Sequence, residues 1–285
     1  MARNNRDRTG SKATDDSPPI PKVLEKTTDS ETSFSFVSPT EFVELPSKGL
    51  FYPEGHSLHG IDTVEIRYMT AKDEDILTSK ALLRKGVAID RLLKNVIVDS
   101  GVRIDDLLIG DKNAILVATR ITGYGPEYNT KVGCVACGEV TEFNFMLSVD
   151  NFRGLEPTND VEQTENGTFV TTLPKSEVTV EFKLLNGSDE KAIARQAEMK
   201  KKQKLPESSQ TDAFRTYIVS VNSSTDKKHI NQFINSMPAM DSRFLRKMYT
   251  ALVPNIDMTQ TFACDECGHE EEMEVPLTAE FFWPK

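Results

Sequence analysis

The sequence predicts an α+β fold in which a helical N-terminal lobe precedes two cysteine-bearing hairpins that enclose a long insertion. Three observations lead to this prediction. Helical periodicity dominates residues 70–125. The unit Cys-x-x-Cys-Gly occurs at residues 134–138 and again at 264–268, with alternating, strand-like patterns on both sides of each copy. The 126 residues from 138 to 263 carry one β-hairpin pattern and three helical patterns.

The first part of the sequence predicts a disordered tail, followed by a segment rich in turns. Residues 1–38 are rich in Ser, Thr, Asp, Lys and Pro and contain few large apolar groups, so they cannot bury enough surface to offset the entropy of ordering. Proline and glycine punctuate residues 41–55 and predict an irregular path. Residues 62–70 alternate apolar and polar groups, which is typical of a half-buried strand.

Three helical patterns complete the N-terminal lobe, which we place at residues 39–125. The first, 70–86, has Thr70 or Asp73 as its N-cap and Gly86 just past its end. The other two are 88–101 and 103–125, the last ending at Gly123. The lobe is therefore expected to contain one strand followed by helices.

The rest of the chain divides around the two cysteine pairs. Residues 126–150 form the first pair with a strand on each side, and residues 255–285 form the second pair with an aromatic C-terminus. Residues 151–254 are the inserted region. Its patterns predict a hairpin over 168–187 and helices over 188–204, 226–237 and 241–253.

Composition limits the classes of partner. Lys and Arg total 34 against 44 Asp and Glu, and the net charge of −10 disfavours broad contact with nucleic-acid phosphates and favours basic partners. No apolar run is long enough to span a bilayer, and no hydrophobic segment follows the basic N-terminus, so we expect neither export nor a membrane-spanning segment. Four cysteines are too few for a disulfide scaffold, and a reducing cytosol favours metal binding.

Cys134, Cys137, Cys264 and Cys267 are the predicted metal ligands. In a zinc knuckle two thiolates hold one side of a tetrahedral ion, and a glycine after the second cysteine allows the turn into the returning strand. Two knuckles complete one four-cysteine site, so the sequence predicts a split zinc ribbon with one structural zinc ion, closed across the insertion. Because four thiolates leave no open coordination position, this zinc is not expected to be hydrolytic.

The alternative is two independent pairs, either redox sites or buried cysteines. A thioredoxin-like pair needs its first cysteine at a helix N-terminus that follows a strand, where the helix dipole lowers the thiol pKa. Here each second cysteine leads through glycine into an alternating strand, which favours the shared site. His269 could replace one cysteine ligand, although an exposed residue near the site is the simpler interpretation.

The remaining candidate motifs are weaker. His56 and His59 have metal-like spacing but no adjacent carboxylate or cysteine, so they are read as turn residues. The stretch "GYGPEY" lacks the Gly-Lys-Ser/Thr end of a phosphate loop, and "EMKKKQK" is typical of a solvated helix face or of a surface for an acidic partner. No motif suggests a catalytic site, so we expect a protein that is not an enzyme.

The C-terminal stretch "VPLTAEFFWPK" places three aromatic residues near the chain end. Phe281, Phe282 and Trp283 either fold into the protein's own core or anchor a neighbouring subunit, because aromatic groups often dominate interfaces. The N-terminal tail is a second candidate partner-binding segment.

Several stretches together resemble the baseplate hub protein family of T-even-type contractile-tailed bacteriophages. They run from about residue 41 to the end and are "ELPSKGLFYP", "LTSKALLRKG", "DLLIGDKNAILVATRITGYGPEY", the first knuckle, "MPAMDSRFLRKMYTALVPNIDM", the second knuckle and "VPLTAEFFWP". The resemblance implies a non-enzymatic structural component or assembly factor of the tail baseplate hub, with other baseplate or hub proteins as partners. It also implies that the protein is made in the host cytoplasm and is located in the virion tail baseplate.

Two other function classes stay open on the sequence alone. A zinc-ribbon module associated with nucleic acid or transcription would bind DNA or RNA in a salt-dependent way. The acidic residues around the second knuckle disfavour it, because carboxylates repel phosphate. A thiol oxidoreductase would have a Cys134 thiolate that is alkylated rapidly, whereas a zinc-bound thiolate resists alkylation until a chelator is added.

Overall fold

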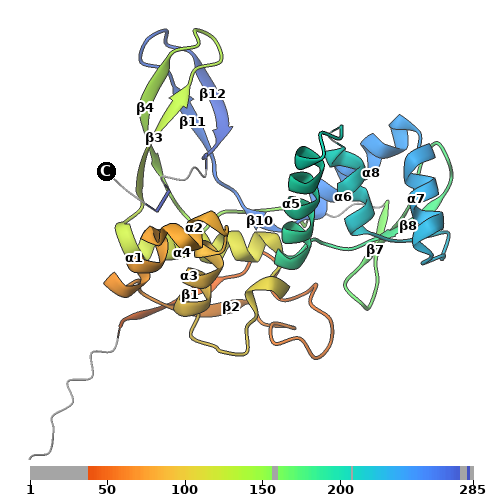
Figure 1. Cartoon of the computed structure of the whole chain (residues 1–285), viewed down its shortest axis with the longest axis horizontal. Helices are drawn as coiled ribbons and strands as arrows, with labels where there is room; N and C mark the ends of the chain where they lie inside the picture. Colours follow the sequence, from red (N-terminus) through yellow and green to blue (C-terminus); the bar gives the residue numbers. More distant parts are fainter. Residues whose placement is uncertain (1–37, 156–159, 207, 277–280, 283–285) are drawn as a thin grey trace, which may run out of the picture. The chain divides into compact units, whose positions relative to one another are not determined.

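A computed structural model describes residues 38–155, 160–206, 208–276 and 281–282, and these belong to one compact unit, Ser38–Lys285 (Figure 1). The described residues form eight α-helices and several small antiparallel sheets, which confirms the α+β class. Apart from Ser38, the expected tail lies outside the described residues, as does Trp283. None of the described helices is both long enough and apolar enough to cross a bilayer.

The chain enters the fold through two paired strands, where the sequence predicted only one. Strand β1 (Thr40–Glu44) runs antiparallel to β2 (Thr63–Arg67), with Val43 opposite Val64 and both side chains buried. The expected strand is β2. Strand β1 was missed because its five residues precede a run of turn-forming prolines and glycines that dominates the local pattern.

The predicted helix over 70–86 is split into α1 (Ala71–Thr78) and α2 (Lys80–Arg84). Ser79 between them is extended, with φ −66° and ψ 105°. Thr70 is the N-cap of α1 and forms a capping box with Asp73. It is one of the two N-caps that the sequence predicted. Helix α3 (Ala88–Val96) then buries the apolar face that the sequence predicted, although it ends earlier than expected.

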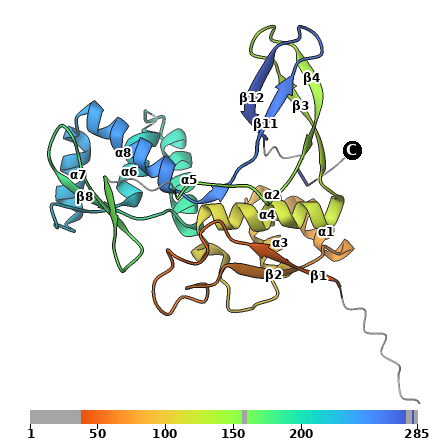
Figure 2. The ribbon, with the colours of Figure 1, turned by 180° about the vertical axis from the view of Figure 1, so that it is seen from behind.

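Helix α4 (Ile109–Tyr124) follows the short 3-10 helix η1 (Ile104–Asp106) and is the central element of the described fold. It contacts α3, β1 and β2 on the N-terminal side, and also the strand β10 (Asn255–Ile256) near the other end of the chain. Figure 2 shows α4 beside the β1–β2 pair. Its C-cap is Gly125 at φ +83°, two residues beyond the expected end.

The segment between the cysteine pairs contains a four-stranded antiparallel sheet. The strands are β6 (Val161–Gln163), β7 (Phe169–Thr172), β8 (Thr179–Phe182) and β9 (Ile218–Val221), in that order. The pair β7–β8 is the predicted hairpin. Strand β5 (Phe152–Arg153) lies outside this sheet and pairs with β10.

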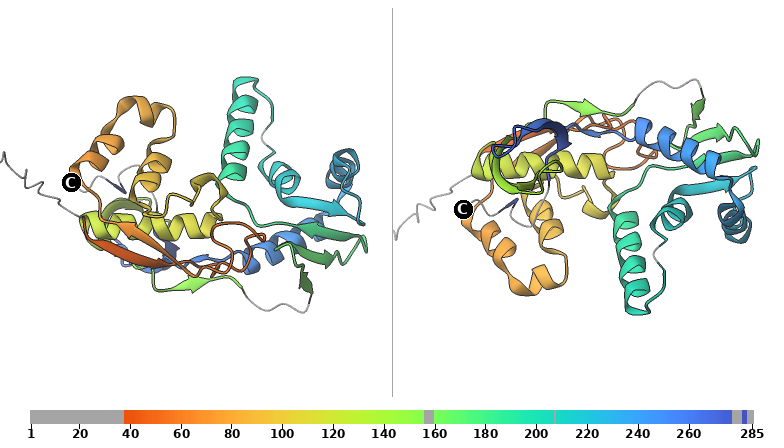
Figure 3. Two further views of the ribbon diagram at one scale, coloured as in Figure 1. Left: turned by 90° about the horizontal axis from the view of Figure 1, so that it is seen from below. Right: turned by 90° about the horizontal axis from the view of Figure 1, so that it is seen from above.

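Four helices accompany this sheet, and three of them were predicted. The helices are α5 (Gly187–Lys202), α6 (Ser209–Tyr217), α7 (Lys227–Ser236) and α8 (Ala239–Leu252). The sequence interpretation missed α6 and the adjoining β9. Tyr217 at the end of α6 stacks on Tyr249 of α8 with ring centroids 4.5 Å apart, so packing of these aromatic rings joins the two helices. Figure 3 shows α5 beside α6, which it contacts.

Candidate metal centre

Two hairpins carry the four cysteines in their turns. The first consists of β3 (Glu127–Gly133) and β4 (Val140–Met146), and the second of β11 (Thr259–Ala263) and β12 (Glu270–Glu274). The last pair before the turn is Gly133 opposite Val140 in one hairpin and Ala263 opposite Glu270 in the other. The hairpins lie side by side with their turns at the same end (Figures 1 and 2).

The first turn is closed by two backbone hydrogen bonds. The N–H of Cys134 donates to the carbonyl of Glu139 at 2.8 Å, and the N–H of Gly138 donates to the carbonyl of Cys134 at 2.9 Å. Gly138 has φ +76°, a left-handed conformation that glycine adopts without steric cost. The glycine after the second cysteine therefore has the role in the turn that the sequence assigned to it.

The second turn repeats the same pattern. The N–H of Cys264 donates to the carbonyl of His269, and the N–H of Gly268 donates to the carbonyl of Cys264, both at 2.9 Å. Gly268 has φ +70°. The two knuckles thus share one local geometry, although they are far apart in the sequence.

An aromatic contact and a side-chain bridge join the two hairpins below the turns. The rings of Phe143 on β4 and Phe262 on β11 meet edge to face, with centroids 5.2 Å apart, and Phe262 is fully buried. The amide side chain of Gln260 accepts from the N–H of Met146 at 3.1 Å and donates to its carbonyl at 2.7 Å. The two hairpins are therefore held together by contacts that do not involve the cysteines.

All four cysteine sulfurs lie within 4.8 Å of one another. Across the two hairpins, Sγ of Cys134 is 3.7 Å from Sγ of Cys267, and Sγ of Cys137 is 3.8 Å from Sγ of Cys264. These separations are far longer than a disulfide bond of about 2 Å. Four sulfurs at about 2.3 Å from a central tetrahedral ion are separated by about 3.8 Å, so the cluster fits one ion of that kind.

Hydrogen bonds and contacts between the sulfurs shift the pKa values of Cys134 and Cys137 in opposite directions. The backbone N–H of Cys137 lowers the pKa of Cys134 to about 6. For Cys137, the backbone at Glu139 lowers the pKa, but burial and the neighbouring thiols outweigh this and raise it to about 12. The thiol of Cys137 therefore resists deprotonation beside the other sulfurs of the cluster. A bound dication would favour the additional thiolates, and its binding would release protons.

The histidines singled out in the sequence do not join the cluster. The sulfurs of the four cysteines form the potential metal-binding group found among the described residues. The backbone of His269 contributes to the second turn. His56 accepts from the N–H of Leu58 at 3.1 Å and its ring stacks on Tyr52, and Nδ1 of His59 lies 2.7 Å from the carbonyl of Tyr52. Both are turn residues, as the sequence suggested.

Phe281 and Phe282 pack in the core of this chain. They are 3% and 2% exposed, so of the two alternatives that the sequence left open for these side chains, the structure shows packing in the chain's own core. The buried guanidinium of Arg120 explains their position, because its Nε donates to the carbonyl of Phe281 at 2.6 Å. The same guanidinium donates to the carbonyls of Gly125 and Glu127 at 2.8 and 3.0 Å.

The sequence interpretation missed two supporting residues. The bridge made by Gln260 has no sequence signature, because an amide in an alternating strand is ordinarily solvated. Arg120 stands among the apolar positions of a helix pattern, and an arginine in that place signals a buried polar contact whose partner the sequence cannot identify.

Comparison with known proteins gives one match. The sequence model of the family described as "T4 bacteriophage base plate protein" matches residues 39–283. No curated protein and no solved structure matches this chain.

Proposed function

The chain belongs to the T4 bacteriophage base plate protein family, and we propose that it is a zinc-stabilised, non-enzymatic component or assembly factor of the tail baseplate hub. The match over residues 39–283 carries this proposal, because it includes both hairpins, the helical lobe and the inserted region. Membership supports a structural role in the phage baseplate. Assignment to the hub rests on the series of motifs from "ELPSKGLFYP" to "VPLTAEFFWP".

The chemistry of the cysteine cluster supports zinc as its ion. Four sulfur ligands at tetrahedral separations are typical of structural zinc, which has no geometric preference that would distort them. Cys134 and Cys137 would hold one side of the ion, and Cys264 and Cys267 the other. A site filled by four thiolates has no position for water or substrate, which favours a structural role.

The physical function of such an ion is to tie the two ends of the inserted region together. Closing the loop between the cysteine pairs costs about 4 kcal/mol of chain entropy, whereas structural zinc sites contribute about 10 kcal/mol or more. Aromatic and amide contacts between the hairpins add to this. A rigid junction of this kind suits a protein that must present several surfaces to neighbouring subunits.

The proposed function predicts where the protein is found during infection. An epitope-tagged copy of the full chain should copurify with baseplate hub intermediates from infected-cell lysates. Its presence in purified particles distinguishes a hub component, and its loss from finished particles distinguishes an assembly factor. Both outcomes support a hub function. Recovery of the tagged protein only as a free chain, in lysates that contain normal hub intermediates, contradicts it.

A further inference from the structure

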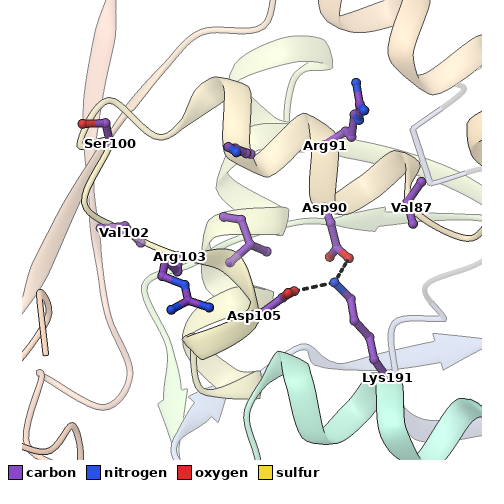
Figure 4. Close-up of a pocket in the computed structure, with 10 residues that line it drawn as sticks. Val87, Asp90, Arg91, Ser100, Val102, Arg103, Asp105 and Lys191 are labelled. Carbon is purple, nitrogen blue, oxygen red and sulfur yellow. Dashed lines mark hydrogen bonds and ion pairs between the residues drawn. The ribbon is translucent and has the colours of Figure 1, made fainter.

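A cavity of about 340 Å³ opens between α3, the segment 100–105 and α5. Figure 4 shows Lys191 reaching from α5 to the carboxylates of Asp90 and Asp105. Arg91, Lys94 and Arg103 also line the cavity. We refer to this cavity with its three further cations as the basic groove.

The acidic side chains of the groove are already neutralised by lysines. Asp90 pairs with Lys191 at 2.6 Å and with Lys112 at 3.2 Å, and Asp105 pairs with the same Lys191. These ion pairs fasten α5 to the N-terminal lobe. Among the residues that line the groove, four cations, Arg91, Lys94, Arg103 and Lys191, stand against the two carboxylates of Asp90 and Asp105, so an excess of positive charge remains.

The three other cations of the groove are exposed and available to a ligand. Arg91 and Lys94 make no ion pair with any residue in the described ranges. Arg103 has an ion pair with Asp106 at 3.3 Å, but its side chain is 76% exposed, so this contact is weak. A surface with unbalanced positive charge is unusual in a chain whose net charge is −10, and it fits an acidic ligand.

The same chain carries an acidic surface at the second knuckle. Asp265, Glu266, Glu270 and Glu272 are exposed and form no ion pair among the residues that the structure describes. Glu270 and Glu272 alternate along β12, so their side chains extend from the same face of the hairpin. We refer to these four carboxylates as the acidic hairpin end.

We propose that the acidic hairpin end of a second copy of this chain binds in the basic groove. The two surfaces have opposite charge, and the described structure pairs neither with the other within one chain. Because the contact joins two different surfaces, it is heterologous, and each bound copy still offers one free groove and one free hairpin end. Repetition therefore gives a ring or an open chain of subunits.

Two variants with complementary defects test this contact in the full-length protein. The groove variant is Arg91→Gln with Arg103→Gln, and the hairpin variant is Glu270→Gln with Glu272→Gln. At low ionic strength, analytical ultracentrifugation should show association of the wild type, weakened at least tenfold by raising the salt concentration. Each variant alone should be monomeric.

Mixing the two variants gives the decisive result. The groove variant retains an intact hairpin end and the hairpin variant retains an intact groove, so an equimolar mixture should form a dimer that cannot grow further. Control variants carry the same charge changes elsewhere, at exposed Lys201 and Lys204 and at exposed Glu162 and Glu165. They should associate like the wild type. Circular dichroism and zinc content confirm that all variants are folded.

Several outcomes overturn the proposal. They are a wild type that stays monomeric at low salt, folded variants that associate as the wild type does, or a mixture that remains monomeric. None of these results bears on copurification with hub intermediates, so this proposal can fail while the proposed function stands.

Discussion

At the scale of single residues, Asp73 shows how one buried carboxylate fixes the start of a helix. Its oxygens accept from the guanidinium of Arg67 at 2.7 and 2.9 Å, and from the N–H and hydroxyl of Thr70 at 2.9 and 2.8 Å. Burial raises the pKa of Asp73, but the hydrogen bonds from Arg67 and Thr70 outweigh burial and lower the pKa to about 2. The charge of Asp73 therefore stabilises both α1 and its junction with β2.

Replacing this carboxylate should reduce the stability of the fold by an amount that depends on pH. A carboxyl whose pKa is lower in the folded state stabilises the fold above its unfolded pKa of about 4, and this contribution is lost as the pH falls toward about 2. Asp73→Asn should therefore lower the free energy of unfolding by about 2 kcal/mol at neutral pH and by less at pH 3. Urea unfolding at several pH values measures the difference.

The exposed Asp75 in the same helix provides the control. Asp75→Asn should change the free energy of unfolding little at any pH, because exposed positions without partners contribute little. An Asp73→Asn effect of the same size at pH 3 and pH 7 would show that packing, and not charge, is what Asp73 supplies.

At the scale of secondary-structure elements, the close approach of α4 to β10 joins the beginning of the fold to its end. Gly110 lies in the first turn of α4, and a Cβ placed there would be 1.8 Å from the carbonyl oxygen of Pro254. The obstructing atom belongs to backbone, so it cannot rotate away. This contact requires glycine for reasons of space.

Gly110→Ala should therefore be strongly destabilising, even though alanine favours helices. The helix propensity gain of about 1 kcal/mol is small beside the displacement of β10, and we expect a net loss of about 3 kcal/mol or more. Gly133→Ala is the matched control, because no atom lies within 4 Å of its added Cβ and its φ is not positive. Equal melting temperatures for the two variants would contradict the tight α4–β10 contact.

The elements also show what the sequence could and could not predict. Both cysteine hairpins follow strict alternation, and α3, α5, α7 and α8 have clear periodicity, so they were predicted. Strand β9 was missed because its pairing with β8 depends on residues about 40 positions away, which local patterns do not report. The break at Ser79 was missed because helical residues continue on both sides of it.

The candidate site shows the same limit. Residue types and the repeated glycine predict all four cysteines as metal ligands, and the structure brings their sulfurs within 4.8 Å of one another. The contacts that support them, between Phe143 and Phe262 and through Gln260, join segments more than 100 residues apart. Sequence patterns can predict such candidate ligands more readily than the packing that positions them.

At the scale of the whole molecule, the cysteine cluster closes the chain on itself. The α4–β10 contact and the β5–β10 pair already bring both ends of the inserted region to the helical lobe. The hairpins extend that junction, and one ion shared by both would make the stability of the junction depend on metal. We infer that one ion shared by the four cysteines holds the two hairpins together.

Metal content measured by native mass spectrometry tests this claim most directly. The wild type should carry one zinc per chain, and Cys134→Ser and Cys264→Ser should each lose it, because either change leaves three thiolates and weakens both knuckles. Ser148→Ala, at a position away from the cluster, should keep the zinc. Two zinc ions per wild-type chain, or a Cys134→Ser variant that retains full zinc through Cys264 and Cys267, would contradict a single shared site.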